Sequence, residues 1–146
     1  MTKSTKRPED TQQIALVNHL KEHYPGTIGV SNLAGVHLHP SIKAKIASMQ
    51  THTKQADLLV LEGRGGWFSL ALELKRDHDS FLNKNGTFKK GYISQQVFTS
   101  QHLRGLGYYA DMVTLDEAIA TIEWYKSLQL TKLPNDLPLF DGRNIK

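Results

Sequence analysis

The stretch Asp57-Leu-Leu-Val-Leu-Glu-Gly-Arg-Gly-Gly-Trp-Phe-Ser-Leu-Ala-Leu-Glu-Leu-Lys75 decides how this chain folds. It contains two apolar runs, residues 58–61 and 67–74, separated by a glycine-rich segment. The first run is continuously apolar, which is typical of a strand buried on both faces, and the second has large apolar residues at alternate positions. Two such strands joined by a glycine turn predict a β-hairpin.

Charged residues stand at the ends of these two predicted strands. Asp57 begins the first strand, and Glu73 and Lys75 end the second. Because side chains on a strand alternate between faces, Glu73 and Lys75 share one face with Trp67, and the opposite face carries Phe68, Leu70, Leu72 and Leu74. A solvent-exposed strand end would by itself explain the Glu73 and Lys75 pair.

Asp57 makes a functional interpretation stronger. An acidic residue at the start of one strand and Glu-x-Lys at the end of its partner can bring two carboxylates and a lysine together. Carboxylate oxygens suit Mg²⁺, and a lysine can orient or help to deprotonate an attacking water. This is the chemistry of phosphodiester hydrolysis.

The register of the hairpin decides whether the two carboxylates can meet. If the strands paired directly across residues 63–66, Asp57 would lie opposite Leu72, on the face away from Glu73. A shift by an odd number of residues, through another turn length or a β-bulge, would place Asp57 near Ala71 or Glu73. We therefore predict such a shifted register.

Asp57 followed by Glu73-Leu74-Lys75 resembles the active-site signature of the PD-(D/E)xK nuclease superfamily. The sequence departs from that pattern at Ala56, where the superfamily usually has a proline that acts mainly on the backbone. The resemblance implies that Asp57, Glu73 and the backbone carbonyl of Leu74 hold Mg²⁺, with Mn²⁺ able to substitute. It also implies that Lys75 positions the nucleophilic water.

The remaining patterns predict the order of elements around the hairpin. We expect helices over residues 8–22, 41–50, 95–106 and 114–127, and strands over residues 27–31 and 108–113. The helix signals include Ser94 as an N-cap, Gly107 as a stop and a capping box from Thr114 to Glu117. The order matches an α/β, restriction-endonuclease-like αβββαβ core with a mixed central sheet flanked by helices. We expect one domain over residues 1–146, with its core at about 9–126 and a tail at 127–146.

A narrower resemblance lies in the second half of the chain. It is similar to the virus-type replication-repair nuclease (VRR-NUC) domain, particularly the short phage-encoded versions. The residues that carry this resemblance are Ile93-Ser-Gln-Gln96, Leu103, Gly107-Tyr108, Asp116-Glu-Ala-Ile119, Ile122 and Tyr125. The resemblance implies that Gln96 contacts water or phosphate in the active site. Ser94 stands two residues before Gln96 rather than the family's three, so no role is assigned to it.

The first predicted helix supplies a further candidate. In the resembled family a glutamate followed by a glutamine in this helix assists catalysis, and Glu9 with Gln13 has that spacing. Asp10 is the competing assignment. Acidic residues in a first turn also complement the helix dipole, which would explain both residues without any catalytic role.

Basic residues are in modest excess, since 18 Lys and Arg against 14 Asp and Glu give a formal charge of +4, which permits a nucleic-acid partner. Lys43 and Lys45, on the outer side of helix 41–50, are either solvated or in contact with phosphates. Segment 77–91 contains Phe88 and the cations Lys84, Lys89 and Lys90. It is either a solvated loop or a flap whose lysines contact phosphates and whose Phe88 stacks on a base.

Composition excludes several other classes. At 39% hydrophobic and 22% charged residues the chain has the composition of an ordinary globular protein. The absence of cysteine excludes disulfides and thiolate zinc sites. No run reaches transmembrane length, and the polar start lacks the apolar core of a signal peptide, so we expect an intracellular, cytoplasmic protein without a membrane partner.

These features predict a Mg²⁺-dependent DNA endonuclease. The VRR-NUC resemblance implies structure-specific cleavage in DNA repair, with Holliday-type four-way junctions or flaps as substrates. It also implies a homodimer, because two scissile phosphates across a junction call for two sites. The alternatives are a catalytically inactive nucleic-acid-binding phage accessory protein with the same fold and, more distantly, an enzyme that acts on RNA or nucleotides.

Overall fold

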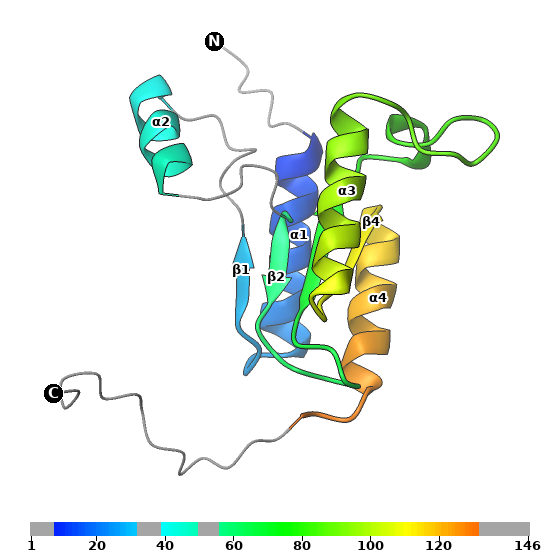
Figure 1. Ribbon diagram of the computed structural model, residues 1–146. Coiled ribbons are helices and arrows are strands. Elements are labelled where there is room, and N and C mark those ends of the chain that lie inside the picture. The colour runs from blue at the N-terminus through cyan, green and yellow to red at the C-terminus, as the bar shows by residue number, and fades with distance from the viewer. Residues whose placement is uncertain (1–7, 32–38, 50–55, 132–146) are drawn as a thin grey trace, which may run out of the picture.

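The computed structural model describes residues 8–31, 39–49 and 56–131 (Figure 1). In chain order its elements are α1 (Pro8–His23), β1 (Gly29–Ser31), α2 (Pro40–Ser48), β2 (Leu58–Val60), β3 (Leu70–Leu74), η1 (His78–Ser80), α3 (Tyr92–Gly105), β4 (Tyr109–Val113) and α4 (Leu115–Ser127). The predicted order of helices and strands, and with it the α/β fold class, is confirmed.

In the described part of the chain the strands form a mixed sheet in the order β1-β2-β3-β4. β1 with β2 and β2 with β3 are antiparallel, whereas β3 and β4 are parallel. The parallel pair needs a crossover connection, and α3 supplies it. α1 and α4 pack on one face of the sheet and α3 packs on the other (Figure 1).

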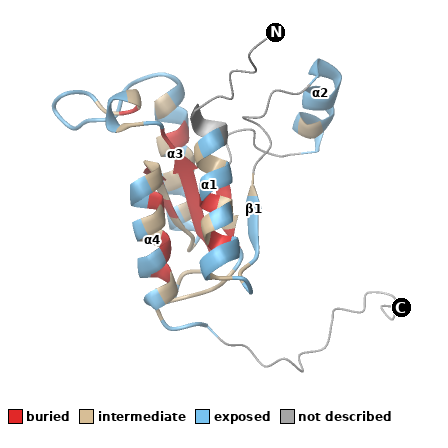
Figure 2. Ribbon diagram, turned by 180° about the vertical axis from the view of Figure 1, so that it is seen from behind, coloured by how far each residue is buried: buried red, intermediate tan, exposed pale blue. Residues whose placement is uncertain are grey.

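The main core lies between the sheet and the α1 and α4 helices. Alternate residues of β3, namely Leu70, Leu72 and Leu74, point to this side and are buried. They meet leucines of α1 and the fully buried Tyr125 of α4, in the buried layer that Figure 2 shows in red. Each fully buried leucine contributes about 1.5–3 kcal/mol. The α3 side of the sheet instead carries the small residues Ala71 and Ala110, which let α3 approach closely.

The first apolar run is not buried on both faces as predicted. Leu58 and Val60 are buried, but Leu59 is only half-buried and Leu61 is 54% exposed. The reason is that α3 packs mainly against β4. The described residues therefore leave the α3 side of β2 partly uncovered.

The alternation predicted for residues 67–74 fails at its start. Phe68 is 67% exposed, while Trp67 packs against the core and contacts the Tyr109 ring edge-on at 5.3 Å between centroids. The Phe68 amide donates to the Gly107 carbonyl, whereas the Tyr109 amide donates to the Ser69 carbonyl. In a regular parallel ladder the amide and the carbonyl that make these two bonds belong to the same residue of β3. Here they belong to Phe68 and Ser69, so residues 68–69 contain a β-bulge. The regular strand begins only at Leu70.

The start of α3 also differs from the prediction. The N-cap is Gly91, with φ of 84°, and the helix begins at Tyr92 rather than at Gln95. Glycine reaches this positive φ without strain, so the chain can turn into a helix before Ser94. The Ser94 hydroxyl donates to the Lys89 carbonyl and caps nothing.

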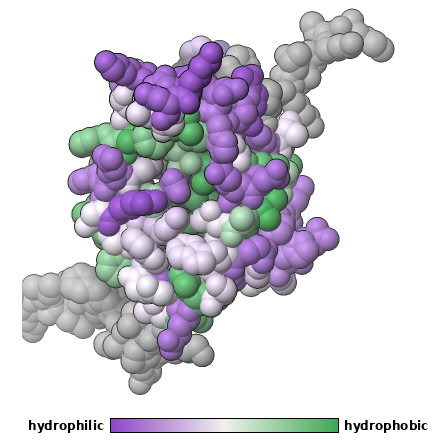
Figure 3. All heavy atoms as spheres, turned by 90° about the vertical axis from the view of Figure 1, so that its right-hand side faces the viewer, coloured by the Kyte–Doolittle hydropathy of each residue, from purple (hydrophilic) through white to green (hydrophobic). Residues whose placement is uncertain are grey.

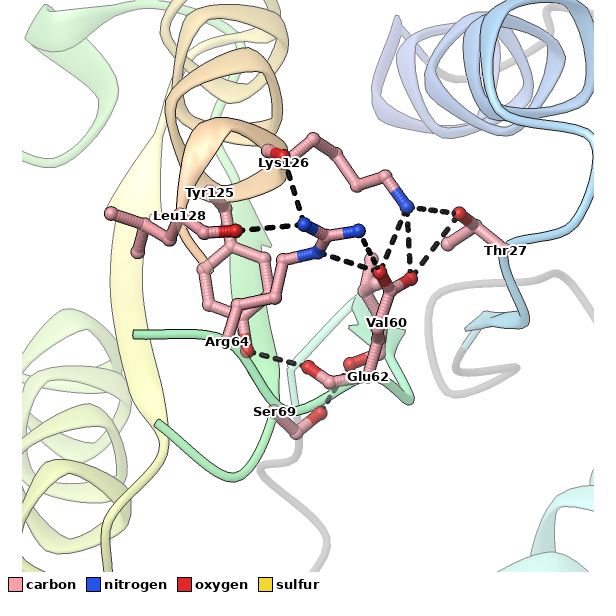
Figure 4. A network of polar contacts seen from close by, with 8 residues as sticks. All are labelled: Thr27, Val60, Glu62, Arg64, Ser69, Tyr125, Lys126 and Leu128. Carbon is pink, nitrogen blue, oxygen red and sulfur yellow. Dashed lines mark hydrogen bonds and ion pairs between the residues drawn. The ribbon is translucent and has the colours of Figure 1, made fainter. Parts of the chain in front are cut away.

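An ion-pair network ties the hairpin turn to α4 (Figure 4). Arg64 Nε donates to Glu62 at 2.6 Å, and Lys126 Nζ lies 2.9 and 3.0 Å from the same carboxylate. Arg64 also donates to the Lys126 and Leu128 carbonyls at the C-terminal end of α4, and the Tyr125 hydroxyl donates to the Glu62 carbonyl. The turn is therefore held in place by residues about 60 positions away in the sequence.

The first residues of the predicted tail belong to this same region. The Gly65 amide donates to the Gln129 carbonyl, and the Thr131 amide donates to the Gly63 carbonyl, both at 2.9 Å. The chain after α4 thus pairs with the hairpin turn up to Thr131. Residues 132–146 lie outside the described residues.

Glu62→Gln should make the free energy of unfolding less dependent on pH in the acid range. Burial of Glu62 opposes its ionisation, but the hydrogen bonds and charges of Lys126 and Arg64 outweigh burial and lower its pKa below 4.5. A lowered pKa stabilises the fold above the unfolded value and loses that effect as pH falls through the folded value. Urea denaturation should show the variant about 1.5–3 kcal/mol less stable at pH 7. The difference should shrink below about pH 4.5.

The matched control for this prediction is Glu22→Gln, an exposed glutamate at the end of α1. It should leave the stability profile unchanged. A Glu62→Gln penalty that stayed constant from pH 7 to pH 3 would contradict the role of the ionised carboxylate.

Gly107→Ala should destabilise the fold by about 1–3 kcal/mol. Gly107 has φ of 97°, and an added Cβ would lie 2.6 Å from the Phe68 ring. Gly105, two residues earlier, has open space around it, so Gly105→Ala should stabilise by about 0.5–1 kcal/mol. Thermal unfolding followed by circular dichroism measures both variants. Equal melting temperatures for the two would show that the turn after α3 tolerates an ordinary residue.

Candidate active site

The hairpin register brings the two predicted carboxylates to one face. Leu58 pairs with Leu72, Leu59 with Ala71 and Val60 with Leu70. Extending this pairing by one residue places Asp57 opposite Glu73, so the predicted odd shift is confirmed. Directly opposed residues project to the same face of a sheet. For Glu73 that is the face of Ala71, on which α3 packs.

Asp57 is held in place by the two elements beside it. Its Oδ2 accepts a hydrogen bond from the Leu74 amide at 2.8 Å, and its backbone carbonyl accepts one from Gln13 Nε2 at 2.9 Å. The Leu74 amide therefore points to the β2 side, while the Lys75 amide donates to Val113 on the β4 side. Because the N–H and C=O of one strand residue point the same way, the Leu74 carbonyl also faces the edge where Asp57 lies.

Glu73, Lys75 and Gln96 form a buried polar cluster beneath α3. Their exposed fractions are 8%, 8% and 4%. Gln96 Nε2 donates to Glu73 Oε1, and Lys75 Nζ lies 3.7 Å from the same oxygen. Lys75 Nζ also lies over the Tyr92 ring, 5.5 Å from its centroid. Burying charged groups is costly unless they are paired, so such a cluster on a half-covered sheet indicates a functional site.

The cluster contains an acceptor whose hydrogen-bonding capacity is unused. Gln96 Oε1 is buried and has no hydrogen-bond partner among the described residues. Leaving a buried acceptor unsatisfied costs about 1–3 kcal/mol. A water molecule is a donor that would satisfy it. Gln12 Oε1 on α1 is likewise buried without a hydrogen-bond partner among the described residues, whereas Gln12 Nε2 donates to the Arg76 carbonyl at 3.3 Å.

These groups fit a hydrated Mg²⁺ or Mn²⁺ ion. Across the described residues no three His, Asp or Glu side chains gather as a metal cluster. Mg²⁺ commonly binds through one or two carboxylates and keeps several waters, whereas zinc sites use three or four protein ligands. Asp57, Glu73 and the Leu74 carbonyl supply such a small oxygen set, and the open Gln96 acceptor suits a water beside it.

The sequence missed Tyr92 as a neighbour of this cluster and Gln12 as a partner of the Arg76 carbonyl. Tyr92 stands one turn before Gln96, so it lies on the same face of α3, but the helix was expected to start after it. Gln12 precedes Gln13 in α1, and its polarity alone carries no positional signal. Glu9 and Asp10 both lie in the first turn of α1, and their side chains are outside the described residues.

The predicted cationic residues fall on two surfaces. Lys84, Lys89 and Lys90 are exposed on residues 77–91, and Figure 3 shows hydrophilic side chains gathered where this segment projects. The segment is folded back on itself, since the Asn83 amide donates to Thr87 at 2.7 Å. Lys43 and Lys45 are exposed on α2, which stands apart from the sheet in Figure 1 and has no buried residue.

Helix direction adds to the electrostatics of this end of the molecule. α1, α3 and α4 all begin at the end of the sheet where β3 and β4 finish (Figure 1). The N-terminal end of a helix carries a partial positive charge. These helix ends therefore place partial positive charge at the end of the sheet where Asp57 and Glu73 lie.

Comparison with known proteins supports the architecture. No protein-family model and no curated protein matches the chain. A solved structure described as a "VRR_NUC domain protein" matches with a TM-score of 0.57 and 22% sequence identity, over 85% of this chain and 92% of that chain. The chain therefore has the VRR-NUC fold, as its sequence motifs predict.

No helix in the described ranges is long and apolar enough to cross a membrane.

Proposed function

We propose that this protein is a Mg²⁺-dependent DNA endonuclease that hydrolyses phosphodiester bonds. The observation that carries the proposal is the opposition of Asp57 and Glu73 across β2 and β3, with buried Lys75 3.7 Å from the Glu73 carboxylate. The name of the similar structure, a VRR_NUC domain protein, supports a nuclease-type function.

Asp57, Glu73 and the Leu74 carbonyl would hold the metal, and Mn²⁺ should substitute for Mg²⁺. When bound, the metal supplies Lewis-acid polarisation of the scissile phosphate and lowers the pKa of an attacking water. The Asp57 side chain is already oriented by the Leu74 amide, and Glu73 by Gln96. Glu73 lies on β3 and Asp57 directly precedes β2, so hydrogen bonds at the end of the sheet preorganise both carboxylates.

Lys75 and Gln96 act on the attacking water. Lys75 Nζ lies beside the Glu73 carboxylate and can donate to the water and to a phosphate oxygen. Gln96 Oε1 can accept a hydrogen from that water, which would satisfy this buried atom. Glu9, or Asp10 in its place, would support the water shell from α1.

We propose structure-specific cleavage, with four-way junctions or flaps as substrates and a homodimer as the form that acts on junctions. The alternative is a nucleic-acid-binding protein of the same fold without turnover. A binding module has no need of two opposed carboxylates near phosphate, so the site favours the enzyme.

Glu73→Gln should abolish cleavage and leave DNA binding equal or tighter, because it removes a metal ligand and a negative charge facing phosphate. The assay uses labelled single-stranded, duplex, flap and four-way DNA with Mg²⁺ or Mn²⁺, and EDTA as a blank. Mn²⁺ should also raise the melting temperature of the wild type but not of the variant. Asp79→Asn, an exposed carboxylate of η1, is the matched control and should remain active.

Wild-type rates in Glu73→Gln would refute the site assignment. DNA binding without cleavage by the wild type, with any metal and on all four substrates, would favour the non-catalytic alternative.

Lys75→Ala should lower the cleavage rate by at least about 10²-fold. Lys75→Arg should also be impaired, because a planar guanidinium is no substitute for a compact ammonium in a closed site. Single-turnover rates on one cleaved substrate measure both. Lys21→Ala, an exposed lysine in the last turn of α1, serves as control and should be unaffected. Near-normal rates for Lys75→Ala would make this lysine a structural partner of Glu73 only.

Changing Lys84, Lys89 and Lys90 together to alanine should weaken binding to all DNA substrates. The slope of log affinity against log salt should become shallower by up to about 0.9 for each lost duplex phosphate contact. A Lys43→Ala, Lys45→Ala double variant tests α2 in the same way. An unchanged slope would assign the corresponding lysines to a solvated surface.

A further inference from the structure

A pocket of about 160 Å³ lies on the other side of α3 from β2, against the outer edge of β4. Val97, Ala110 and Met112 contribute its apolar lining. Met112 pairs with Glu73 in the parallel ladder, so the pocket is one strand away from the proposed catalytic carboxylate. Neighbouring strands are about 4.8 Å apart.

Aromatic and polar groups from three elements surround this pocket. Phe88, 46% exposed, reaches it from segment 77–91, and Ser100 and Gln101 line it from α3. Asp111 lines it from β4, with Oδ1 accepting from the Met112 amide at 2.8 Å. The pocket therefore offers the Phe88 ring, which stacks on Phe81 at 6.3 Å between centroids, and hydrogen-bonding groups from α3 and β4.

The charge of the pocket does not suit a phosphate. Among the described residues that line it, Arg104 is the one cation. Arg104 Nη2 lies 3.7 Å from Asp111 Oδ2, and Nε donates to the Ala110 carbonyl at 2.5 Å. The Asp111 carboxylate would repel an anion and attract N–H donors. Arg104 Nε occupies the outward-facing Ala110 carbonyl, and Asp111 Oδ1 occupies the outward-facing Met112 amide. These two hydrogen bonds therefore also oppose the pairing of another strand with the free edge of β4.

The size of the pocket suits one flat ring. A cavity of about 150 Å³ in another protein binds benzene. The ligand predicted by these features is planar, uncharged and apolar on its faces, with hydrogen-bond donors and acceptors at its edge. A nucleobase has this chemistry.

We propose that this pocket holds an unpaired base of the DNA strand being cut, with Phe88 against its face and Asp111 and Gln101 at its edge. The inference rests on the proposed nuclease function and deepens it. A base inside a duplex is stacked on both faces and paired along one edge, so only an unpaired or extruded base can enter. The pocket therefore selects DNA with an unpaired nucleotide next to the cleavage position, as at the branch point of a flap.

The test measures binding without cleavage, using Glu73→Gln and fluorescence anisotropy. Flap DNA is compared with copies in which an abasic analogue replaces one nucleotide at a time around the branch point. One position should lose affinity by about 5- to 150-fold, the range of base–aromatic stacking. Adding Phe88→Leu or Asp111→Asn should remove this dependence on the base and leave affinity for intact duplex unchanged.

The matched control is Phe98→Ala, since Phe98 is 66% exposed on α3 but does not line the pocket. It should keep the full dependence on the base. Equal affinity for base-bearing and abasic flaps at every position, with normal DNA binding, would refute the proposed base-binding role of the pocket. It would leave the nuclease proposal standing. Absence of binding to any DNA would overturn both. A dependence lost in Phe98→Ala but kept in Phe88→Leu would also refute this placement.

Discussion

The pairing of Leu58 with Leu72 is the constraint on which the rest of this structure depends. Side chains alternate along a strand, so a one-residue slip would exchange the two faces of the hairpin. The register that buries Leu70, Leu72 and Leu74 against α1 and α4 also turns Glu73 towards α3 and places Asp57 opposite it. The hydrophobic core therefore specifies the geometry of the site, because the free energy of burying these leucines opposes any slip.

Both ends of the hairpin reinforce that register by different means. At the turn, Arg64 and Lys126 bind one carboxylate, Glu62, and fasten the turn to α4. At the site end, the Asp57 carboxylate caps the Leu74 amide, and Gln13 of α1 holds the Asp57 carbonyl. The bulge at residues 68–69 lies outside the paired stretch, so it changes the faces of Trp67 and Phe68 without disturbing Glu73.

Two sides of α3 contribute to the two proposed functional features of the molecule. The face that meets the sheet carries Gln96, which orients Glu73 and retains an open acceptor. The flank above β4 carries Gln101 and Arg104 of the adjoining pocket. Because Glu73 and Met112 are paired across β3 and β4, the pocket lies one β-strand away from the proposed catalytic carboxylate. Cleavage chemistry and choice of substrate would thus share one small helix-covered region.

The sequence by itself determined the order of the elements, the shared face of Glu73 and Lys75, the need for an odd register shift and the stop of α3 at Gly107. These follow from strand parity, capping chemistry and glycine conformation, which act over a few residues. Resemblance to a known signature added Gln96. Only the tertiary structure decided the bulge at residues 68–69, the exposure of Leu61, the place of Tyr92 beside Lys75, and the partners of Glu62 and Asp111. Each of these depends on which distant segment covers a face or supplies a charge, and no local pattern records that.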